Sequence, residues 1–321
     1  MKYIITGATG HIGNNLVRLL LSKGINVKIL VRNLKDKAIE NLVCEKVVGD
    51  ITDVSFLDSV IEEGSIVIHC AGLIDVTNKL VDDLMNVNVW ATIDLVQVCI
   101  KKKVGKFIYI SSTDALNGYG IVKEPLEFSL DGMDSYYGIS KAMASDYILK
   151  AINMGLINGC ILCPSCVIGV NDYKVSSQGG VIKKQIKKKV ALSTKGHYNF
   201  IDVDNLVEAI YNASIVDTKP IYLLTGVDVN VSSLFKAIFK VLNKKGVIIH
   251  IPLFLVKFGL LFMPIYYKIT KQKPIFTKFT IKTINEKKTF DSSLAKNELG
   301  LKDTNFEKVI EKTINWFLKN E

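Results

Sequence analysis

The sequence predicts an α/β protein with a doubly wound parallel sheet and a smaller C-terminal α/β lobe. Short apolar runs alternate with helical patterns through the first half of the chain, which is typical of parallel strands joined by crossover helices. The 321 residues, 49% of them hydrophobic, can form a large core. We expect strands at residues 3–5, 27–31, 46–48, 66–69, 107–110, 159–162 and 199–203.

The first half of the chain has the clearest pattern, and we expect residues 1–168, joined by 197–220, to form the larger unit. Residues 169–196 and 221–321 are then expected to form the smaller lobe. Clefts between two such units are common sites for small-molecule ligands.

A glycine-rich turn, with Gly7, Gly10 and Gly13, joins the first predicted strand to a helical pattern. Glycines at this spacing allow a sharp turn, the close approach of a pyrophosphate and tight packing of the helix on the sheet. The N–H groups at the start of that helix can then bind phosphate. An ordinary tight turn would share the spacing, but the strand and helix around it favour a dinucleotide site, to which His11 and Ile12 would also belong.

Lysine supplies nearly all of the positive charge of the chain. The formal net charge is +10, but only two of the 41 basic residues are arginines, and no nucleic-acid recognition motif accompanies the lysines. We therefore expect no nucleic-acid partner. The first predicted strand begins at residue 3, which leaves no room ahead of it for a signal peptide, so we expect a cytoplasmic protein.

Cys160, Cys163 and Cys166 form a C-x2-C-x2-C run that is similar to part of a metal-ligand set. The run begins in a predicted buried strand, on which Cys160 and Cys163 would point to opposite faces. No cysteine or histidine partner follows at ligand spacing. We therefore interpret all three as buried thiols and expect no metal.

Residues 247–267 are almost wholly apolar, interrupted by two prolines, a lysine, a histidine and a glycine. The length matches a membrane span, but the breaks favour a bent helix in the core or beside a substrate pocket. Peripheral contact with a membrane is the second interpretation, and a true span is the third.

Tyr137 and Lys141 lie one helical turn apart on one face of a predicted helix. A phenol ordinarily has a pKa of about 10, and a nearby ammonium favours its ionised form, so the pair is suited to proton exchange at neutral pH. Ser111, Ser112 and Thr113 end the strand before this helix and place hydroxyls at the same edge of the sheet. One of these hydroxyls could hold a substrate oxygen beside Tyr137.

The same tyrosine–lysine spacing occurs at Tyr119 with Lys123 and at Tyr267 with Lys271. Glycines on both sides of Tyr119 and a following proline disfavour a helix there. Tyr267 lies in the late apolar segment, far along the chain from the glycine turn. These contexts favour Tyr137 as the reactive tyrosine.

Together these motifs resemble the extended short-chain dehydrogenases/reductases, also called the NAD-dependent epimerase/dehydratase group. The resemblance covers nearly the whole chain and implies a Rossmann-type fold. The matching residues are Thr6-Gly7-x-x-Gly10-x-x-Gly13, Gly49-Asp50, Cys70-Ala71-Gly72, Asn88, Ser111-Ser112-Thr113, Tyr137-x-x-x-Lys141, Pro164-Ser165 and Phe200-Ile201-Asp202-Val203-Asp204.

By this resemblance, Tyr137 is the general acid/base, Lys141 tunes it and binds the nicotinamide ribose, and Thr113, favoured over Ser112, polarises the substrate oxygen. Asn88 would brace a helix under the site, and a homodimer is common in the family. The further cofactor-binding residues that the resemblance implies are Asp50 and Ile51 beside the adenine, Cys70, Ala71 and Gly72 beside the cofactor, and Pro164 and Val167.

Arg32 follows the second predicted strand, where an NAD-specific chain usually offers an acidic residue to the ribose hydroxyls. Arginine suits a 2′-phosphate instead, which it can bind through charge-assisted hydrogen bonds. Lys35 and Lys37 could add positive charge, whereas Asp36 opposes it. NADP(H) is therefore favoured over NAD(H).

The predicted smaller lobe contains neither arginine, although nucleotide-sugar enzymes of this family typically clamp the diphosphate with arginine. Residues 162–169 resemble the dihydroflavonol reductase and 3β-hydroxysteroid dehydrogenase branch, except at Cys163, where that branch usually has a basic residue. We expect hydride transfer between nicotinamide and a hydroxyl or carbonyl carbon of a small hydrophobic substrate. The alternatives are a nucleotide-sugar epimerase or dehydratase that retains NAD, and a non-catalytic dinucleotide-binding regulatory protein.

Overall fold

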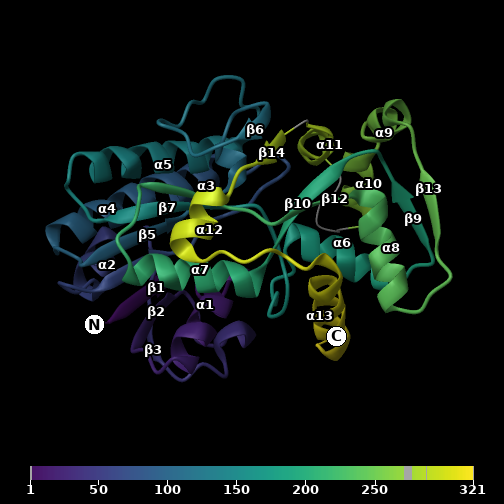
Figure 1. Ribbon diagram of the computed structural model, residues 1–321. Helices are drawn as coiled ribbons and strands as arrows, with labels where there is room; N and C mark the ends of the chain where they lie inside the picture. Colours follow the sequence, from purple (N-terminus) through teal and green to yellow (C-terminus); the bar gives the residue numbers. More distant parts are fainter. Residues whose placement is uncertain (1, 271–276, 287, 321) are drawn as a thin grey trace.

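A seven-stranded parallel sheet forms the centre of the larger unit in the computed structural model, which describes residues 2–270, 277–286 and 288–320. The strand order is β3-β2-β1-β4-β5-β7-β11, so the chain turns back across the sheet between β3 and β4 (Figure 1). This is the doubly wound sheet that the sequence predicts. The strands are β1 (Tyr3–Thr6), β2 (Val27–Val31), β3 (Glu45–Val48), β4 (Ile66–His69), β5 (Lys106–Ile110), β7 (Gly159–Pro164) and β11 (Ile221–Leu224).

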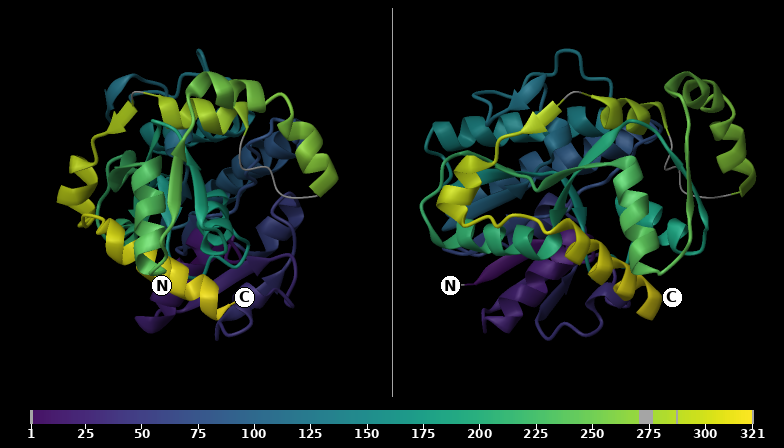
Figure 2. Two further views of the ribbon diagram at one scale, coloured as in Figure 1. Left: turned by 90° about the vertical axis from the view of Figure 1, so that its right-hand side faces the viewer. Right: turned by 45° about the vertical axis from the view of Figure 1, so that its right-hand side comes forward.

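Helices cover both faces of this sheet (Figure 2). Because successive strand residues point to opposite faces, Ile5 is buried in one hydrophobic cluster and Ile4 in the other. The cluster of Ile5 includes α1 (His11–Ser22) and α7 (Val203–Ile215), and that of Ile4 includes α2 (Val54–Val60), α4 (Ala91–Lys101) and α5 (Tyr136–Asn153). Shorter elements are η1 (Lys37–Ile39), α3 (Val81–Leu84), the π-helix η2 (Met85–Trp90), η3 (Thr113–Ala115) and β6 (Gly120–Val122).

The strand order opens a crevice at the carboxyl ends of β1 and β4, where ligands bind in open parallel sheets. The glycine turn follows β1, residues 70–72 follow β4, and residues 111–113 follow β5. The fold therefore brings these predicted motifs to one edge of the sheet.

A smaller sheet of β8 (Cys166–Ile168), β10 (His197–Asp202) and β12 (Val227–Asn230) supports the second lobe. Its core contains Ile182, Ile238 and Ile310, all fully buried. These residues come from α6 (Ser177–Ile186), α8 (Val231–Val241) and α13 (Phe306–Lys319). Two further ribbons pair β9 (Val190–Ser193) with β13 (Val247–His250), and β14 (Lys288–Phe290) with β6.

The boundaries between the units differ from the predicted ones. The sequence placed all of 221–321 in the smaller lobe, but β11 pairs with β7 at the edge of the large sheet. The helix α12 (Ser293–Leu299) packs on α7 and β11. Conversely, β8 and β10 join the smaller sheet although the sequence assigned them to the larger unit. Apolar strands suit either sheet, so their sequence did not distinguish the two.

Residues 247–267 do not form one bent helix buried in the core, although Leu253 and Leu260 line a groove. They form β13, α9 (Leu253–Gly259) and the start of α10 (Met263–Thr270), because Pro252 begins and Gly259 ends a short helix. Phe258 and Phe262 are 62% and 56% exposed. Across the described residues, no helix combines the length and apolar character needed to cross a membrane.

Cys160 and Cys163 lie on opposite faces of the large sheet, as predicted for a strand. Cys160 belongs to the cluster of α1 and α7, and Cys163 to that of α4 and α5. Burial raises the pKa of each thiol to about 12, so both remain protonated at neutral pH.

Candidate active site

A cavity at the carboxyl edge of the large sheet collects most of the predicted site residues. Those that line it are Gly10, His11, Ile12, Gly13, Cys70, Gly72, Ser112, Thr113, Tyr137, Pro164 and Val167. The predicted residues outside its lining are Gly7, Arg32, Asp50, Ile51, Ala71 and Lys141. The cavity therefore unites the glycine turn with the tyrosine and hydroxyl motifs.

Each of the three glycines of the turn is required for a different structural reason. Gly7 has φ +72°, and a Cβ there would lie 2.5 Å from Ala71 N. A Cβ on Gly13 would lie 2.4 Å from Gly7 O, which keeps α1 tight against the turn. Gly10 is less crowded by protein, with Gly7 O at 3.3 Å from the same position, and it lines the cavity. Gly10 thus leaves space for a ligand.

The N-terminus of α1 is suited to an anion. No side chain caps it, and its first turn contains no acidic residue. Two buried polar atoms of cavity residues, His11 Nδ1 and Ser165 Oγ, also lack a hydrogen-bond partner in the described part of the chain. The glycine cradle, the uncapped helix and these two atoms fit a nicotinamide dinucleotide, with its pyrophosphate at α1.

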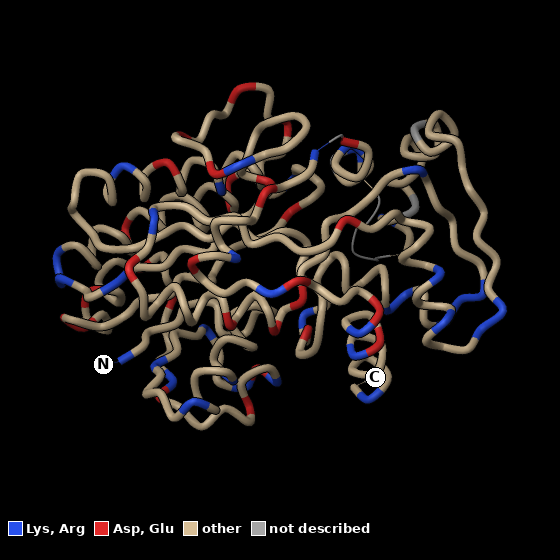
Figure 3. Tube along the Cα trace, viewed as in Figure 1, with Lys and Arg blue, Asp and Glu red and all other residues tan. Residues whose placement is uncertain are grey.

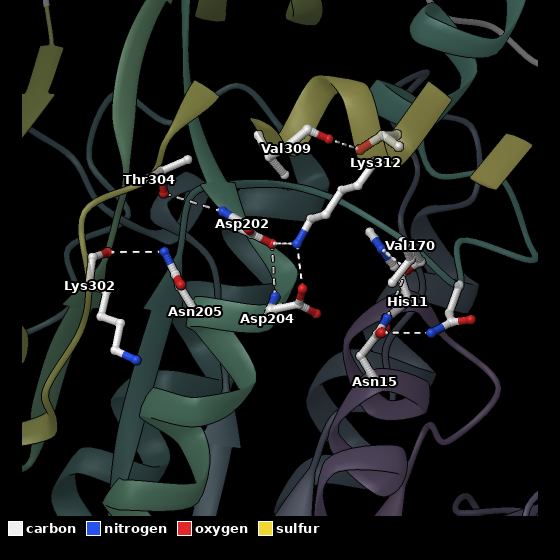
Figure 4. A network of polar contacts seen from close by, with 12 residues as sticks. His11, Asn15, Val170, Asp202, Asp204, Asn205, Lys302, Thr304, Val309 and Lys312 are labelled. Carbon is white, nitrogen blue, oxygen red and sulfur yellow. Dashed lines mark hydrogen bonds and ion pairs between the residues drawn. The ribbon is translucent and has the colours of Figure 1, made fainter. Parts of the chain in front are cut away.

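His11 also joins α1 to the segment after β8 (Figure 4). Its Nε2 donates to Val170 O at 2.9 Å, and Asn15 Nδ2 donates to the same carbonyl at 3.0 Å. Burial lowers the pKa of His11, so Nδ1 remains an unprotonated acceptor at neutral pH. In the same view, Lys312 of α13 pairs with Asp202 at the start of α7. These contacts fix the smaller lobe against the large sheet.

The three hydroxyls after β5 have different partners. Ser111 Oγ lies 2.8 Å from Ser145 Oγ of α5, and Ser112 Oγ accepts a hydrogen bond from Asp114 N at 3.1 Å. Within the described residues, no hydrogen bond is found for the Thr113 hydroxyl, although Thr113 lines the cavity. Thr113 therefore retains a hydroxyl that a substrate oxygen can use.

Tyr137 lies in the first turn of α5 and is only 8% exposed. The sequence predicted that Lys141 would favour its ionised form, but in the unliganded structure other groups determine the direction of the Tyr137 pKa shift. Burial raises the pKa of Tyr137 well above its ordinary value, the Asp114 carboxylate raises it further, and a hydrogen bond with Ser112 opposes the rise. The phenol is protonated at neutral pH, which is the form that can donate a proton.

Lys141 explains this correction, because its ammonium is engaged below the cavity. Its Nζ donates to Ile110 O at 2.8 Å and to Tyr109 Oη at 3.2 Å. Burial lowers the pKa of Lys141 to about 8. A Cβ on Gly72 would lie 3.2 Å from this ammonium, so the glycine leaves room for Lys141 at the cavity wall.

Buried side chains support the two catalytic motifs from below. Asn88 accepts from Leu73 N at 2.7 Å and donates to Ser140 Oγ of α5 at 3.0 Å. His69, which the sequence did not single out, lies 2.6 Å from Thr6 Oγ1 through Nδ1. Burial lowers the pKa of His69 to about 3, so the ring stays neutral. These bonds hold the ends of β1 and β4 and the helix α5 in place.

Arg32 and Asp50 lie beside one another, outside the cavity. Arg32 is exposed at the carboxyl end of β2, and Gly49 N donates to Val31 O at 3.0 Å, which places Asp50 at the neighbouring strand end. The Asp50 carboxylate accepts from Thr52 N at 3.0 Å. This location at the ends of β2 and β3 matches the adenosine side of a dinucleotide site.

Lys174 is a basic residue near the glycine turn that the sequence did not indicate. Its Nζ donates to Thr9 Oγ1 at 2.8 Å and pairs with Asp36 at 3.1 Å. Asp36, the acid that opposed a phosphate role for Arg32, is thus paired with Lys174. The long separation of Lys174 and Thr9 in sequence left no local signal for this contact.

The wall of the cavity that comes from the smaller lobe is neutral. It includes Cys166, Gln178, Tyr198 and, from α11 (Lys278–Asn285), Thr280 and Thr283. Neither lysine nor arginine is found among the described residues that line the cavity.

The acidic residue of the cavity is Asp114, which directly follows the hydroxyl motif. Burial raises the pKa of its carboxyl to about 6, and the charge of Lys288 opposes this rise. The sequence position beside Thr113 was the available signal, but it did not reveal the burial.

The alternative tyrosines lie away from the cavity. Tyr119 is 78% exposed between Gly118 and Gly120, and the residues after it form β6 rather than a helix. Tyr267 lies in α10, and Lys271, its proposed partner, is outside the described residues.

Sequence comparisons identify relatives whose names refer to sterols or steroids. "Sterol demethylase protein B" of Methylococcus capsulatus is 27% identical over 99% of this chain and 98% of the relative. "3 beta-hydroxysteroid dehydrogenase/Delta 5-->4-isomerase" of Monkeypox virus is 26% identical over 66% of this chain and 63% of the relative.

Comparisons of structure support the fold. The crystal structure of gox2253 matches with a TM-score of 0.82 and 24% identity, over 99% of this chain and 98% of that one. UDP-glucuronic acid 4-epimerase from Bacillus cereus, solved with NAD, matches with a TM-score of 0.76 and 19% identity, over 100% of this chain and 99% of that one. A family match, to the NAD dependent epimerase/dehydratase family, spans residues 3–218. With the glycine cradle, Tyr137 and Lys141 on the same sheet edge, the chain belongs to the NAD-dependent epimerase/dehydratase family.

Proposed function

We propose that this protein is a reductase that transfers a hydride from NADPH to a carbonyl carbon of a small hydrophobic molecule, or catalyses the reverse reaction. The observation that carries the proposal is the charge of the cavity. Its described lining contains Asp114 but no lysine or arginine. Because the N-terminus of α1 would hold the cofactor's pyrophosphate, the second diphosphate of a nucleotide sugar would need cationic partners elsewhere in the lining, whereas an uncharged ketone or alcohol would not.

The protonation state of Tyr137 supports the reductive direction. NADPH supplies the hydride when it is bound. As negative charge develops on the carbonyl oxygen, Tyr137 donates its phenolic proton and Thr113 donates a hydrogen bond to the same oxygen. Lys141 and Asn88 hold α5, and therefore Tyr137, against the sheet edge.

The names of the relatives agree with an apolar substrate. One is named for sterol demethylation and another for the dehydrogenation of a hydroxysteroid. Both names describe chemistry on a large apolar ring system. We therefore propose a hydrophobic ketone or secondary alcohol as the substrate class.

The proposed preference for NADP(H) depends on Arg32. Its side chain is exposed at the end of β2, and the nearby Asp36 is paired with Lys174. A 2′-phosphate would therefore meet the guanidinium with the charge of Asp36 already offset by Lys174.

Calorimetric titration with NADPH, NADH and UDP-glucose, followed by rate measurements with a panel of hydrophobic ketones, tests the proposal. We expect NADPH to bind more tightly than NADH, UDP-glucose not to bind, and at least one ketone to be reduced with net oxidation of NADPH. Tight binding of UDP-glucose with a retained NAD would instead establish the nucleotide-sugar alternative. Dinucleotide binding without turnover on either substrate class would favour a regulatory protein.

A further inference from the structure

The outer surface of the smaller lobe exposes apolar side chains on two neighbouring features. The first is the β9–β13 ribbon, and the second is the helix pair α9–α10 that follows it in the chain (Figures 1 and 2). On the helices, Phe254, Phe258, Leu261, Phe262, Ile265 and Ile269 are each more than half exposed. We call the ribbon and the two helices the outer face.

The register of the ribbon places its exposed residues on one side. Val190 pairs with Val247 and Leu192 with Ile249 in parallel strands. Because residues two apart share a face, these four side chains lie together, and each is about half exposed. The alternate residue Ala191 is buried in the lobe core. The ribbon therefore has a normal inner face and an apolar outer one.

Positive charge predominates around the outer face, although Glu286 lines the groove beside Leu253. Residues 173–201 and 229–285 contain 17 lysines and no aspartate or glutamate, whereas the rest of the chain has 24 basic and 31 acidic residues. Exposed lysines precede both ribbon strands, at Lys188 and Lys189 before β9 and at Lys245 before β13. Figure 3 shows this group at the end of the ribbon, away from α9.

From this combination we propose that the outer face docks on the surface of an anionic lipid bilayer. Lysines are attracted to anionic headgroups, and Phe, Leu and Ile side chains can enter the region between headgroups and acyl chains. No described helix can span a membrane, so the contact is peripheral. Docking on such a bilayer accounts for both the exposed apolar side chains and the lysines of the lobe.

Other partners use only part of this surface. A nucleic acid would pair with lysines but leave aliphatic side chains unused. A symmetric dimer would bring the lysine-rich surface of each copy against itself, which is unfavourable. A bilayer satisfies the charged and apolar groups together.

The outer face is adjacent to the catalytic cavity. Thr280 and Thr283 of α11 line the cavity, while Ile281 of the same helix lines a groove with Leu253 and Leu260 of the α9 region. Among the described residues, those of α11 line both the cavity and this groove. Docking would therefore bring the cavity close to a phase that dissolves hydrophobic molecules, although the docking proposal does not depend on the proposed reaction.

Co-sedimentation of the full chain with vesicles tests the proposal. We expect binding to vesicles of equal parts phosphatidylglycerol and phosphatidylcholine at least about tenfold tighter than binding to phosphatidylcholine alone, and weaker binding at high salt. Equal binding to both vesicle types, or binding to neither, would overturn it. Binding to a DNA duplex without vesicle binding would assign the lysines to nucleic acid instead.

Two sets of variants separate the apolar and charged contributions. Phe258→Ser with Phe262→Ser, and separately Lys188→Gln with Lys189→Gln and Lys245→Gln, are each expected to weaken vesicle binding about tenfold. Ile121→Ser with Leu126→Ser is the matched control, because these residues are also exposed but lie in the larger unit. Circular dichroism confirms folding of each variant. Unchanged vesicle binding in both outer-face variants would overturn the proposal. It would also be overturned if the protein bound no vesicles and formed a dimer that dissociated in the variant with Phe258→Ser and Phe262→Ser.

Discussion

The carboxyl edge of the large sheet and the outer face of the smaller lobe both contain aromatic and lysine side chains, which are buried at the sheet edge and exposed on the outer face. At the sheet edge, Tyr137 and Lys141 are buried, and hydrogen bonds fix Lys141 and the helix that carries both. On the outer face, Phe258 and Lys188 are exposed to solvent. Proton transfer requires groups at fixed positions with shifted pKa values, whereas docking on a fluid surface requires exposed area and charge. If the groups at the sheet edge act in catalysis from fixed positions, substitutions there should change turnover, stability and pH dependence in specific ways.

The largest expected effect follows removal of the Tyr137 hydroxyl. Tyr137→Phe should lower turnover about 1000-fold, because general acid catalysis is lost, while affinity for NADPH changes less than about twofold. Steady-state kinetics and calorimetry measure the two quantities. Tyr136→Phe, next to it in α5 and 40% exposed, should leave both nearly unchanged. Full activity of Tyr137→Phe would show that Tyr137 at the sheet edge is not the general acid.

A smaller effect is expected where backbone packing closes the glycine turn. Gly13→Ala should lower the free energy of unfolding by on the order of 2 kcal/mol, because its Cβ would lie 2.4 Å from Gly7 O. Urea denaturation measures this loss. Gly10→Ala, with the same atom at 3.3 Å, should retain most of the stability and lose mainly dinucleotide affinity. The reverse pattern would contradict the separate roles of the two glycines.

The buried carboxyl of Asp114 gives a pH-dependent prediction. Its folded pKa of about 6 lies above its ordinary value, so stability is lost as pH rises from about 4, where the unfolded carboxyl ionises, to about 6, where the folded one does. Asp114→Asn should therefore stabilise the protein by roughly 2 kcal/mol at high pH, and the gain should vanish below the ordinary carboxyl pKa of about 4. Thermal unfolding across pH measures it. The exposed Asp131→Asn is the control, and an equal gain for Asp114→Asn at all pH values would refute the assignment.

The same variant should change the pH dependence of alcohol oxidation. Ionised Asp114 raises the pKa of Tyr137, so Asp114→Asn should move the rising limb of kcat/KM toward lower pH. A limb that stays in place would show that the two groups do not interact during catalysis.

The smallest expected effect is at the adenosine end. Arg32→Ala should weaken NADPH binding about tenfold, because one charge-assisted contact to the 2′-phosphate is lost, and leave NADH binding nearly unchanged. Calorimetry with both cofactors in one variant supplies its own control. Equal losses for NADPH and NADH would mean that Arg32 does not read the phosphate.

Local patterns explain how much of this molecule the sequence predicts. The strands β1 to β5 and β7, the glycine turn and the helical pair of Tyr137 and Lys141 depend on neighbouring residues, and all lie where expected. Glycines flanking Tyr119 likewise indicated a segment without a helix.

Contacts between distant segments explain what the sequence did not predict. Lys174 reaches Thr9 across the two lobes, and β11 completes the large sheet from a segment assigned to the smaller lobe. The pKa of Tyr137 rises because burial and Asp114 act on it while Lys141 contacts Ile110, and spacing along a helix contains none of this information. The exposure of Phe258 also depends on how distant segments pack around it.

The proposed reaction of the cavity is the reduction of a hydrophobic ketone by a dissociable NADPH. The most direct measurement follows deuterium from NADPH labelled at the nicotinamide carbon into the product, with the stoichiometry of cofactor oxidation measured in the same reaction. We expect one deuterium on the new alcohol carbon for each NADPH oxidised, and no transfer by Tyr137→Phe. Conversion of UDP-glucose to an epimer with no net change in the cofactor, and no label transferred to any ketone, would contradict it.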